Sequence, residues 1–215
     1  FEEQIWGKHD KVQRAIDILK SFEPKEGYFL AFSGGKDSQC VYHLAKMAGV
    51  KFDAHYSVTG IDPPELIYFI RKNYPDVIWD HHYWNDGKPE HYFKNGKPKP
   101  MTMWGVIADH TIPPTRQARY CCQALKESSG KGRVVCTGVR WAESTSRKNS
   151  RGIFERNHDK PEKRIILNND NDDKRQLFES CKLQGKRTVN PIIDWTDSEV
   201  WDFLYDAKVP INPLY

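Results

Sequence analysis

The hydrophobic pattern divides the first part of the chain into short apolar runs separated by amphipathic segments. Residues 28–32, Tyr-Phe-Leu-Ala-Phe, form a run without polar alternation, which is typical of a strand buried on both faces. Val12, Ala15, Ile16 and Leu19 recur at helical spacing and mark one face of an N-terminal helix. The elements expected next are a helix over 38–47, a strand over 52–58, a helix over 64–73 with proline in its first turn, and a strand over 76–79. This alternation predicts an α/β fold with a doubly wound, parallel, Rossmann-like sheet.

The second part of the chain is less regular. Residues 81–115 predict a long loop with one short helix near 103–108. The further elements expected are a helix over 117–127, strands over 133–138 and 189–193, and a helix after the capping-box sequence at 196–199. Residues 140–164 hold eight Arg or Lys against four Asp or Glu, which favours a mobile, basic surface loop. We therefore expect a single domain over 1–215, with a basic insertion at about 140–173.

Composition narrows the class of protein. The 215 residues are enough to bury a sizeable core, and the net charge of +4 suits a phosphate-bearing ligand. No stretch approaches the roughly 18 apolar residues of a membrane span, and the first residues lack a secretory signal pattern. Five cysteines, two of them adjacent, do not resemble a disulfide framework, so we expect a reduced, cytoplasmic protein that contacts no membrane. The chain starts without Met, so we expect native residues before it.

The most informative motif is the loop 33–38, Ser-Gly-Gly-Lys-Asp-Ser, which follows the first expected strand and opens a helix. Its glycines allow a tight turn and a close approach to a ligand, and the amides of a helix amino end attract an anion. Lys36 adds a positive charge, Ser33 and Ser38 add hydroxyl donors, and Asp37 could hold Mg²⁺ or cap the helix. The loop is not a Walker A sequence. The alternative to a phosphate loop is a plain glycine turn with a serine cap.

These residues resemble the pyrophosphate loop of the adenine nucleotide α-hydrolase fold and, within it, the phosphoadenosine phosphosulfate (PAPS) reductase family. The resemblance covers about residues 27–215, and the motifs follow the family's order. The segments that carry it, besides the loop, are Val-Thr-Gly-Ile-Asp-Pro-Pro-Glu at 58–65, Thr-Gly-Val-Arg at 137–140 with Glu143, Ser144 and Arg147, Asn-Pro-Ile-Ile-Asp-Trp-Thr at 190–196, and Asn-Pro-Leu-Tyr at 212–215.

Two features depart from the usual reductase pattern. Reductases of the family usually have a degraded loop, whereas the intact Lys-Asp-Ser ending here resembles members that split ATP between its α- and β-phosphates. Val58 stands where the family usually has aspartate.

Loop chemistry and resemblance together indicate a nucleotide site. The candidate catalytic residues are Lys36, Asp37 and Arg140. The candidate nucleotide-binding residues are Ser33, Gly34, Gly35, Lys36, Asp37, Ser38, Ser57, Val58, Gly138, Arg116, Arg119 and Arg147. Arginines match phosphate or sulfate bidentately, although a solvated basic face explains the same residues as well.

The cysteines suggest a metal centre. The resemblance implies that adjacent Cys121 and Cys122 supply half of a [4Fe–4S] site, and that a further cysteine pair follows Asn-Pro-Leu-Tyr in a tail beyond Tyr215. Cys181 is the best additional ligand candidate within the chain, since such clusters usually take four thiolates. A redox or structural role for the adjacent pair stays open. Cys40 and Cys136 are expected in the core.

Three functions fit these observations. The first is a sulfur-metabolism enzyme of the PAPS reductase family that acts on ATP, PAPS or adenosine phosphosulfate (APS), with a thiol reductant or sulfur donor as partner. The second is an ATP pyrophosphatase that activates nucleic acid for sulfur insertion, which the basic loop mildly favours. The third is a nucleotide-sensing module without catalysis. A homo-oligomer is expected in each case.

Overall fold

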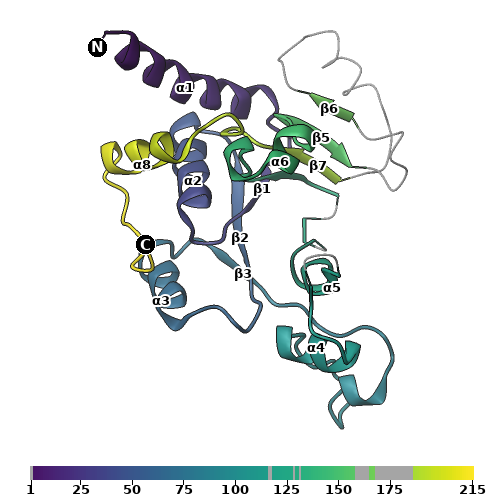
Figure 1. Cartoon of the computed structure of the whole chain (residues 1–215). Coiled ribbons are helices and arrows are strands. Elements are labelled where there is room, and N and C mark those ends of the chain that lie inside the picture. The colour runs from purple at the N-terminus through teal and green to yellow at the C-terminus, as the bar shows by residue number, and fades with distance from the viewer. Residues whose placement is uncertain (1, 116–117, 128, 131, 158–164, 168–185) are drawn as a thin grey trace.

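The computed structural model describes residues 2–115, 118–127, 129–130, 132–157, 165–167 and 186–215. These residues form a sheet with the strand order β3-β2-β1-β4-β7-β5-β6 (Figure 1). The strands are β1 (Tyr28–Ala31), β2 (Phe52–Ser57), β3 (Ile78–Asp80), β4 (Val134–Cys136), β5 (Phe154–Asn157), β6 (Ile165–Leu167) and β7 (Lys186–Val189). The first four strands and β7 run parallel, which confirms the expected α/β class with its parallel sheet.

Helices cover the sheet and connect its strands (Figure 1). They are α1 (Glu2–Ser21), α2 (Lys36–Ala48), α3 (Pro64–Asn73), α4 (Met103–His110), α5 (Tyr120–Cys122), α6 (Thr145–Ser150) and α8 (Asp197–Asp206), with shorter turns η1 (Pro89–His91), η2 (Gln123–Glu127) and η3 (Trp141–Glu143). Helix α2 packs against both α1 and α8. None of the described helices combines the length and the apolar character that crossing a bilayer requires.

Strand β1 lies at the centre of the parallel strands, between β2 and β4, because its side chains are apolar on both faces. Tyr28 and Leu30 are fully buried, and the Tyr28 hydroxyl donates to the Leu19 carbonyl oxygen at 2.8 Å. Phe29 points to the opposite face and stacks on His55, with ring centroids 4.0 Å apart. The loop after β1 therefore emerges at the middle of the carboxyl edge of the parallel strands.

The segment expected to be a mobile basic loop is largely folded where the structure describes it. Strand β5 pairs antiparallel with β7, and Ile153 and Phe154 are buried in the core. Arg140, at the start of the same segment, is 1% exposed. The prediction of an exposed loop is wrong for these residues, because β5 pairs with β7 and two apolar side chains enter the core. Residues 158–164 lie outside the described part.

Some boundaries also differ from the expected ones. Strand β7 ends at Val189, whereas the sequence predicts a strand over 189–193. Pro191 lacks the N–H that further pairing would need, and residues 191–194 form turns instead. The helix expected over 117–127 is described as α5 followed by the wider turns of η2.

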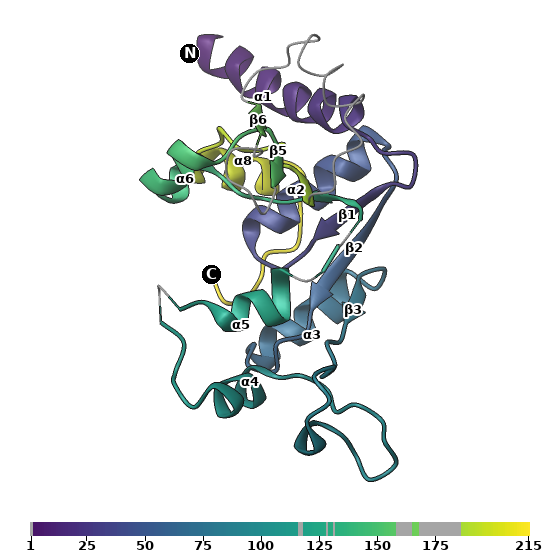
Figure 2. The same cartoon turned by 90° about the vertical axis from the view of Figure 1, so that its right-hand side faces the viewer.

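Residues 81–115 form an arm that extends away from the sheet (Figure 2). Isolated bridges join Tyr83 to Pro100 and Tyr92 to Pro98, so the first half of the arm folds back on itself. Helix α4 follows where the sequence predicts a short helix, and the Thr102 side chain caps it by accepting from the Gly105 amide.

A buried polar network joins β5 to the parallel strands. The side-chain Nδ2 of Asn190 donates to the Gly152 carbonyl oxygen at 2.7 Å and to Glu155 Oε1 at 2.9 Å. Asn190 and Glu155 are both fully buried. Arg151 also donates to the Glu155 carboxylate, at 2.8 Å. The network places a charge inside the protein and satisfies it with hydrogen bonds, which is what makes its burial tolerable.

We expect Asn190→Ala to lower the free energy of unfolding by about 3 kcal/mol, because the Gly152 carbonyl and a buried carboxylate each lose a donor. Chemical denaturation followed by circular dichroism measures this loss. Arg187→Ala serves as the control and should change stability by less than about 0.5 kcal/mol, since Arg187 lies on β7 just before Asn190 but is 44% exposed at its side chain. Equal stability of the two variants would contradict the assignment.

Candidate functional site

The loop 33–38 turns sharply between β1 and α2. Gly34 has φ of +72°, a conformation that residues with a side chain rarely adopt. A Cβ atom at this position would lie 2.7 Å from a methyl carbon of Leu66 and 2.9 Å from one of Ile70. Both the backbone angle and the side chains of α3 that cover this position therefore require glycine. This agrees with the tight glycine turn that the sequence predicts.

The N-cap residue of α2 supplies no capping side chain. This residue is Gly35, and no side chain accepts a hydrogen bond in the usual capping geometry. The Ser38 hydroxyl instead donates to the Gly35 carbonyl oxygen at 2.9 Å and accepts from the Ser33 amide at 3.2 Å. The two serines thus hold the loop in shape, and Asp37 does not cap the helix. The first amides of α2 face the carboxyl edge of the sheet.

Four charged side chains meet beside this amino end. Arg140 Nε donates to Asp37 Oδ1 at 2.8 Å, and Arg140 Nη2 donates to Asp197 Oδ1 at 2.7 Å. Lys36 Nζ lies 3.4 Å from Asp37 Oδ2 and 3.2 Å from Asp197 Oδ1. Arg140 also donates to the Trp195 carbonyl oxygen at 3.2 Å, so its guanidinium is fixed from three sides.

The cluster favours the charged forms of Asp197 and Lys36. Hydrogen bonds from Arg140, and then from Lys36, hold the pKa of Asp197 below its ordinary value. Burial alone would lower the pKa of Lys36, but the carboxylates of Asp37 and Asp197 outweigh burial and raise it. Two cations and two anions balance, so the cluster itself is neutral, and the amino end of α2 supplies the positive potential for an anion.

Two local features bring Arg140 and Asp197 to the loop. A Cβ atom on Gly138 would lie 2.9 Å from the Asp37 carbonyl carbon, so only glycine lets the chain after β4 pass this close to α2. Asp197 begins α8, where Thr196 and Glu199 form the capping box that the sequence predicts. Sequence reasoning missed the role of Asp197, although a carboxylate directly after a cap residue is the signal that could have drawn attention to it.

A cavity of about 160 Å³ lies next to the loop, lined by residues of β1, β2 and η2. Ser33, Ser57 and Asp62 contribute polar atoms to its wall. His55 also lines it and is oriented by Asp80, whose Oδ1 lies 3.0 Å from His55 Nδ1. Of the two candidates at the end of β2, Ser57 lines this cavity, whereas Val58 packs against the core. The cavity therefore lies directly beside the first residue of the loop.

The other candidate arginines are not gathered at the loop in the described part of the structure. Arg119 is exposed, and its Nη2 lies 3.6 Å from the Cys122 sulfur. Arg116 and the side chain of Arg147 lie outside the described residues. Arg140 is therefore the candidate arginine that contacts loop residues in the described structure, and it does so as a buried partner of carboxylates.

The described cysteines do not by themselves form a cluster site. Cys121 and Cys122 are half-buried on α5, whereas Cys40 and Cys136 are fully buried in the core, as the sequence predicts. Burial raises the pKa of the Cys40 thiol, which disfavours the thiolate that metal binding needs. Two accessible thiols are fewer than the usual four ligands, and Cys181 lies outside the described residues. The iron–sulfur cluster stays a prediction, and no step of the chemistry below depends on it.

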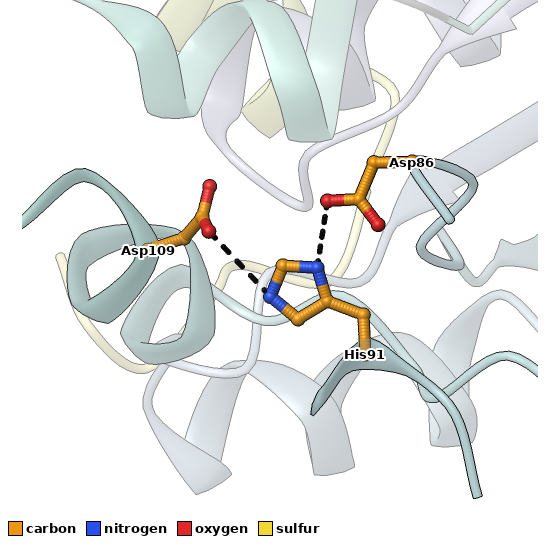
Figure 3. A group of neighbouring side chains, drawn as sticks. All are labelled: Asp86, His91 and Asp109. Carbon is orange, nitrogen blue, oxygen red and sulfur yellow. Dashed lines mark hydrogen bonds and ion pairs between the residues drawn. The ribbon is translucent and has the colours of Figure 1, made fainter. Parts of the chain in front are cut away.

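One further group of potential metal ligands occurs in the arm, and the sequence analysis did not identify it. Figure 3 shows His91 between Asp86 and Asp109, with Nδ1 2.7 Å from Asp86 Oδ2 and Nε2 3.7 Å from Asp109 Oδ1. One ligand atom of each residue lies within 4.8 Å of the others, but each carboxylate already faces a ring nitrogen of His91. The Lys88 ammonium pairs with Asp109 and lies 3.9 Å from Asp86. We interpret the group as a polar network that fastens α4 to the first half of the arm.

Comparison with known proteins agrees with this geometry. The model of the phosphoadenosine phosphosulfate reductase domain family matches residues 27–215. No curated protein sequence matches the chain. The structure is similar to that of FMN adenylyltransferase from Candida glabrata in complex with ATP, with 13% identity, a TM-score of 0.55, and coverage of 98% of this chain and 59% of that chain. It is also similar to PAPS reductase from Candida auris in a phosphate complex, with 14% identity, a TM-score of 0.53, and coverage of 94% of this chain and 83% of that chain.

At these identities the structural likeness shows the fold, which is that of adenine nucleotide α-hydrolase-like proteins. The chain spans about three fifths of the length of the FMN adenylyltransferase.

We expect Arg140→Ala to lower the free energy of unfolding by about 3 kcal/mol, because it leaves Asp37 and Asp197 without their main partner. Thermal and denaturant unfolding measure the loss. Arg14→Ala is the matched control, since Arg14 also pairs with a carboxylate, Asp194 at 2.9 Å, but its side chain is 49% exposed. An exposed pair contributes about 0–1 kcal/mol, so a comparable loss in both variants would contradict the role of Arg140.

For the cysteines, we expect anaerobically purified full-length protein to be brown and to hold about four irons per chain. Cys121→Ser and Cys122→Ser should each remove the colour, whereas Cys40→Ser should retain it, since Cys40 lies in the core. Iron analysis and absorption spectra test this. Colourless, iron-free protein would reject the cluster and leave the adjacent pair with a redox or structural role.

Proposed function

The chain belongs to the phosphoadenosine phosphosulfate reductase family, and from this premise we propose that it is an enzyme of sulfur metabolism that binds an adenine nucleotide with its phosphates on the loop 33–38. ATP, PAPS and APS are the candidate nucleotides, and a thiol reductant or a sulfur donor is the expected second partner.

The observation that carries this proposal is the amino end of α2 behind Gly34, whose N-cap residue Gly35 offers no capping side chain. A positive-φ glycine turns the chain so that the first amides of the helix face outward, and Lys36 lies beside them. Backbone amides, the helix dipole and a lysine are the groups that bind phosphate at such helix ends. The cavity beside Ser33 then has room for part of the nucleoside.

In this proposal each group has a separate task. The α2 amides bind phosphate oxygens, and Lys36, whose raised pKa keeps it protonated, neutralises negative charge that develops on them. Arg140 holds Asp37 and thereby the first turn of α2. Rate enhancement comes from positioning and charge stabilisation, without a covalent protein intermediate.

Magnesium has no evident place on Asp37 in this arrangement. Arg140 binds one oxygen of the Asp37 carboxylate, and Lys36 lies 3.4 Å from the other. A metal bound directly to Asp37 would have to displace Lys36. We therefore assign no step to a magnesium ion on Asp37. A magnesium ion that arrives with ATP would be held by the phosphates of the nucleotide.

The intact Lys-Asp-Ser ending supports a second candidate, the splitting of ATP between its α- and β-phosphates to activate a nucleic acid for sulfur insertion. The solved FMN adenylyltransferase complex, a structure of the same fold, contains ATP. The basic segment lends this candidate less support than the sequence suggested, because Arg140 faces the site interior and β5 joins the sheet.

We expect Lys36→Ala to weaken nucleotide binding by about 1–3 kcal/mol, because it removes a charge-assisted contact to phosphate. Isothermal titration of full-length protein with ATP and with PAPS measures the effect. Lys46→Ala is the control, since Lys46 lies on the same helix with its side chain 52% exposed and should not affect binding. Unchanged affinity of Lys36→Ala for both nucleotides would remove the basis of the phosphate-loop assignment.

Product analysis separates the candidate reactions. The full-length protein is incubated with ATP, PAPS and APS in turn, with a thiol reductant present. Sulfite from PAPS or APS supports the reductase-type reaction, whereas pyrophosphate from ATP supports the second candidate. Nucleotide binding without turnover with any acceptor would instead favour a sensing module.

A further inference from the structure

The first amide of α2 has a partner that comes from the far end of the chain. The Lys36 backbone N–H donates to the Tyr215 hydroxyl at 3.1 Å. The same hydroxyl would lie 3.2 Å from a Cβ atom on Gly35, so it sits directly over the loop. An oxygen atom therefore occupies the position in which a helix amino end holds an oxygen of a phosphate.

The segment 212–215, Asn-Pro-Leu-Tyr, is built to place this hydroxyl. Asn212 is buried, and its Nδ2 donates to the Gly34 carbonyl oxygen at 2.9 Å. Its Oδ1 accepts from the Leu214 amide at 3.0 Å, and its carbonyl oxygen accepts from the Tyr215 amide at 3.2 Å. The Asn212 side chain thus ties a tight turn to the loop itself.

The Tyr215 ring is held as well. It meets the ring of Trp201 on α8 edge to face, with centroids 5.0 Å apart. Tyr205 contacts the same Trp201 ring, at 6.0 Å, but its hydroxyl has no contact with the loop among the described residues. Trp201 therefore packs two tyrosines, of which Tyr215 reaches the amino end of α2.

A tyrosine hydroxyl is both an acceptor and a donor. In the described structure the Tyr215 oxygen accepts from Lys36, and no described acceptor receives its hydrogen. The phosphate of a nucleotide on the loop is an acceptor that carries negative charge, so an O–H donor at this place would form a charge-assisted hydrogen bond with it.

We propose that Tyr215 is a phosphate-contact residue. Its hydroxyl accepts from the Lys36 amide and donates its own hydrogen to a phosphate oxygen of the bound nucleotide. The proposal rests on the proposed function, since it needs a phosphate on the loop. It extends the phosphate site from the local loop to the segment 212–215.

The test is Tyr215→Phe in the full-length protein, titrated with ATP, inorganic pyrophosphate and adenosine. Phenylalanine keeps the ring against Trp201 and removes only the hydroxyl, and the parent side chain is 61% exposed, so the fold should persist. Affinity for ATP and for pyrophosphate should fall about tenfold, which corresponds to one charge-assisted hydrogen bond. Affinity for adenosine should not change, because adenosine has no phosphate. Tyr205→Phe, the matched control, should leave all three affinities unchanged.

Three results would overturn the proposal. Unchanged binding of ATP and pyrophosphate would show that the hydroxyl makes no contact with phosphate. Tighter binding would show that it competes with phosphate for the Lys36 amide. An equal loss for adenosine would show that it only shapes the loop. If Lys36→Ala weakens ATP binding and Tyr215→Phe does not, the role of Tyr215 is wrong and the proposed function stands. If neither variant changes ATP binding, the proposed function is wrong as well.

Discussion

The site depends on one buried cation. Arg140 is almost fully buried, and its guanidinium binds Asp37 on α2, Asp197 on α8 and the Trp195 carbonyl oxygen. A buried arginine is tolerated only when its donors are satisfied, so the folded structure needs all of these partners in place. The requirement fixes α2, α8 and the chain after β4 relative to one another, and with them the amino end that faces the ligand.

The parts of the fold and of the site that depend on neighbouring residues could be predicted from the sequence. The apolar run of β1, the glycine turn and the Thr196 capping box each lie within a few residues, so spacing and residue type predict them. Contacts between distant segments were missed for a physical reason. Arg140 and Asp197 are 57 residues apart, and a basic segment looks the same in sequence whether its arginine faces solvent or a pair of carboxylates.

Strand β5 shows the same limit in the fold. Its sequence, Phe-Glu-Arg-Asn, is mostly polar, and its pairing depends on β7, some thirty residues later. Glu155 reads as a surface residue until Arg151 and Asn190 are seen to bind it. The sequence pattern therefore predicts the apolar parallel strands and misses β5, whose pairing with β7 depends on contacts between distant residues.

The two cations of the site differ in how freely they can exchange partners. Arg140 is enclosed, so losing a carboxylate would leave a buried charge without compensation. Lys36 shares Asp197 with it, and the Asp197 side chain is 68% exposed, so that ion pair is weak and screened. Under the proposed function, an arriving phosphate would replace Asp197 at Lys36 at little cost, while Arg140 continues to hold both carboxylates. The arrangement separates an enclosed cation that maintains the geometry from a cation with an exchangeable partner, which the proposed function assigns to the ligand.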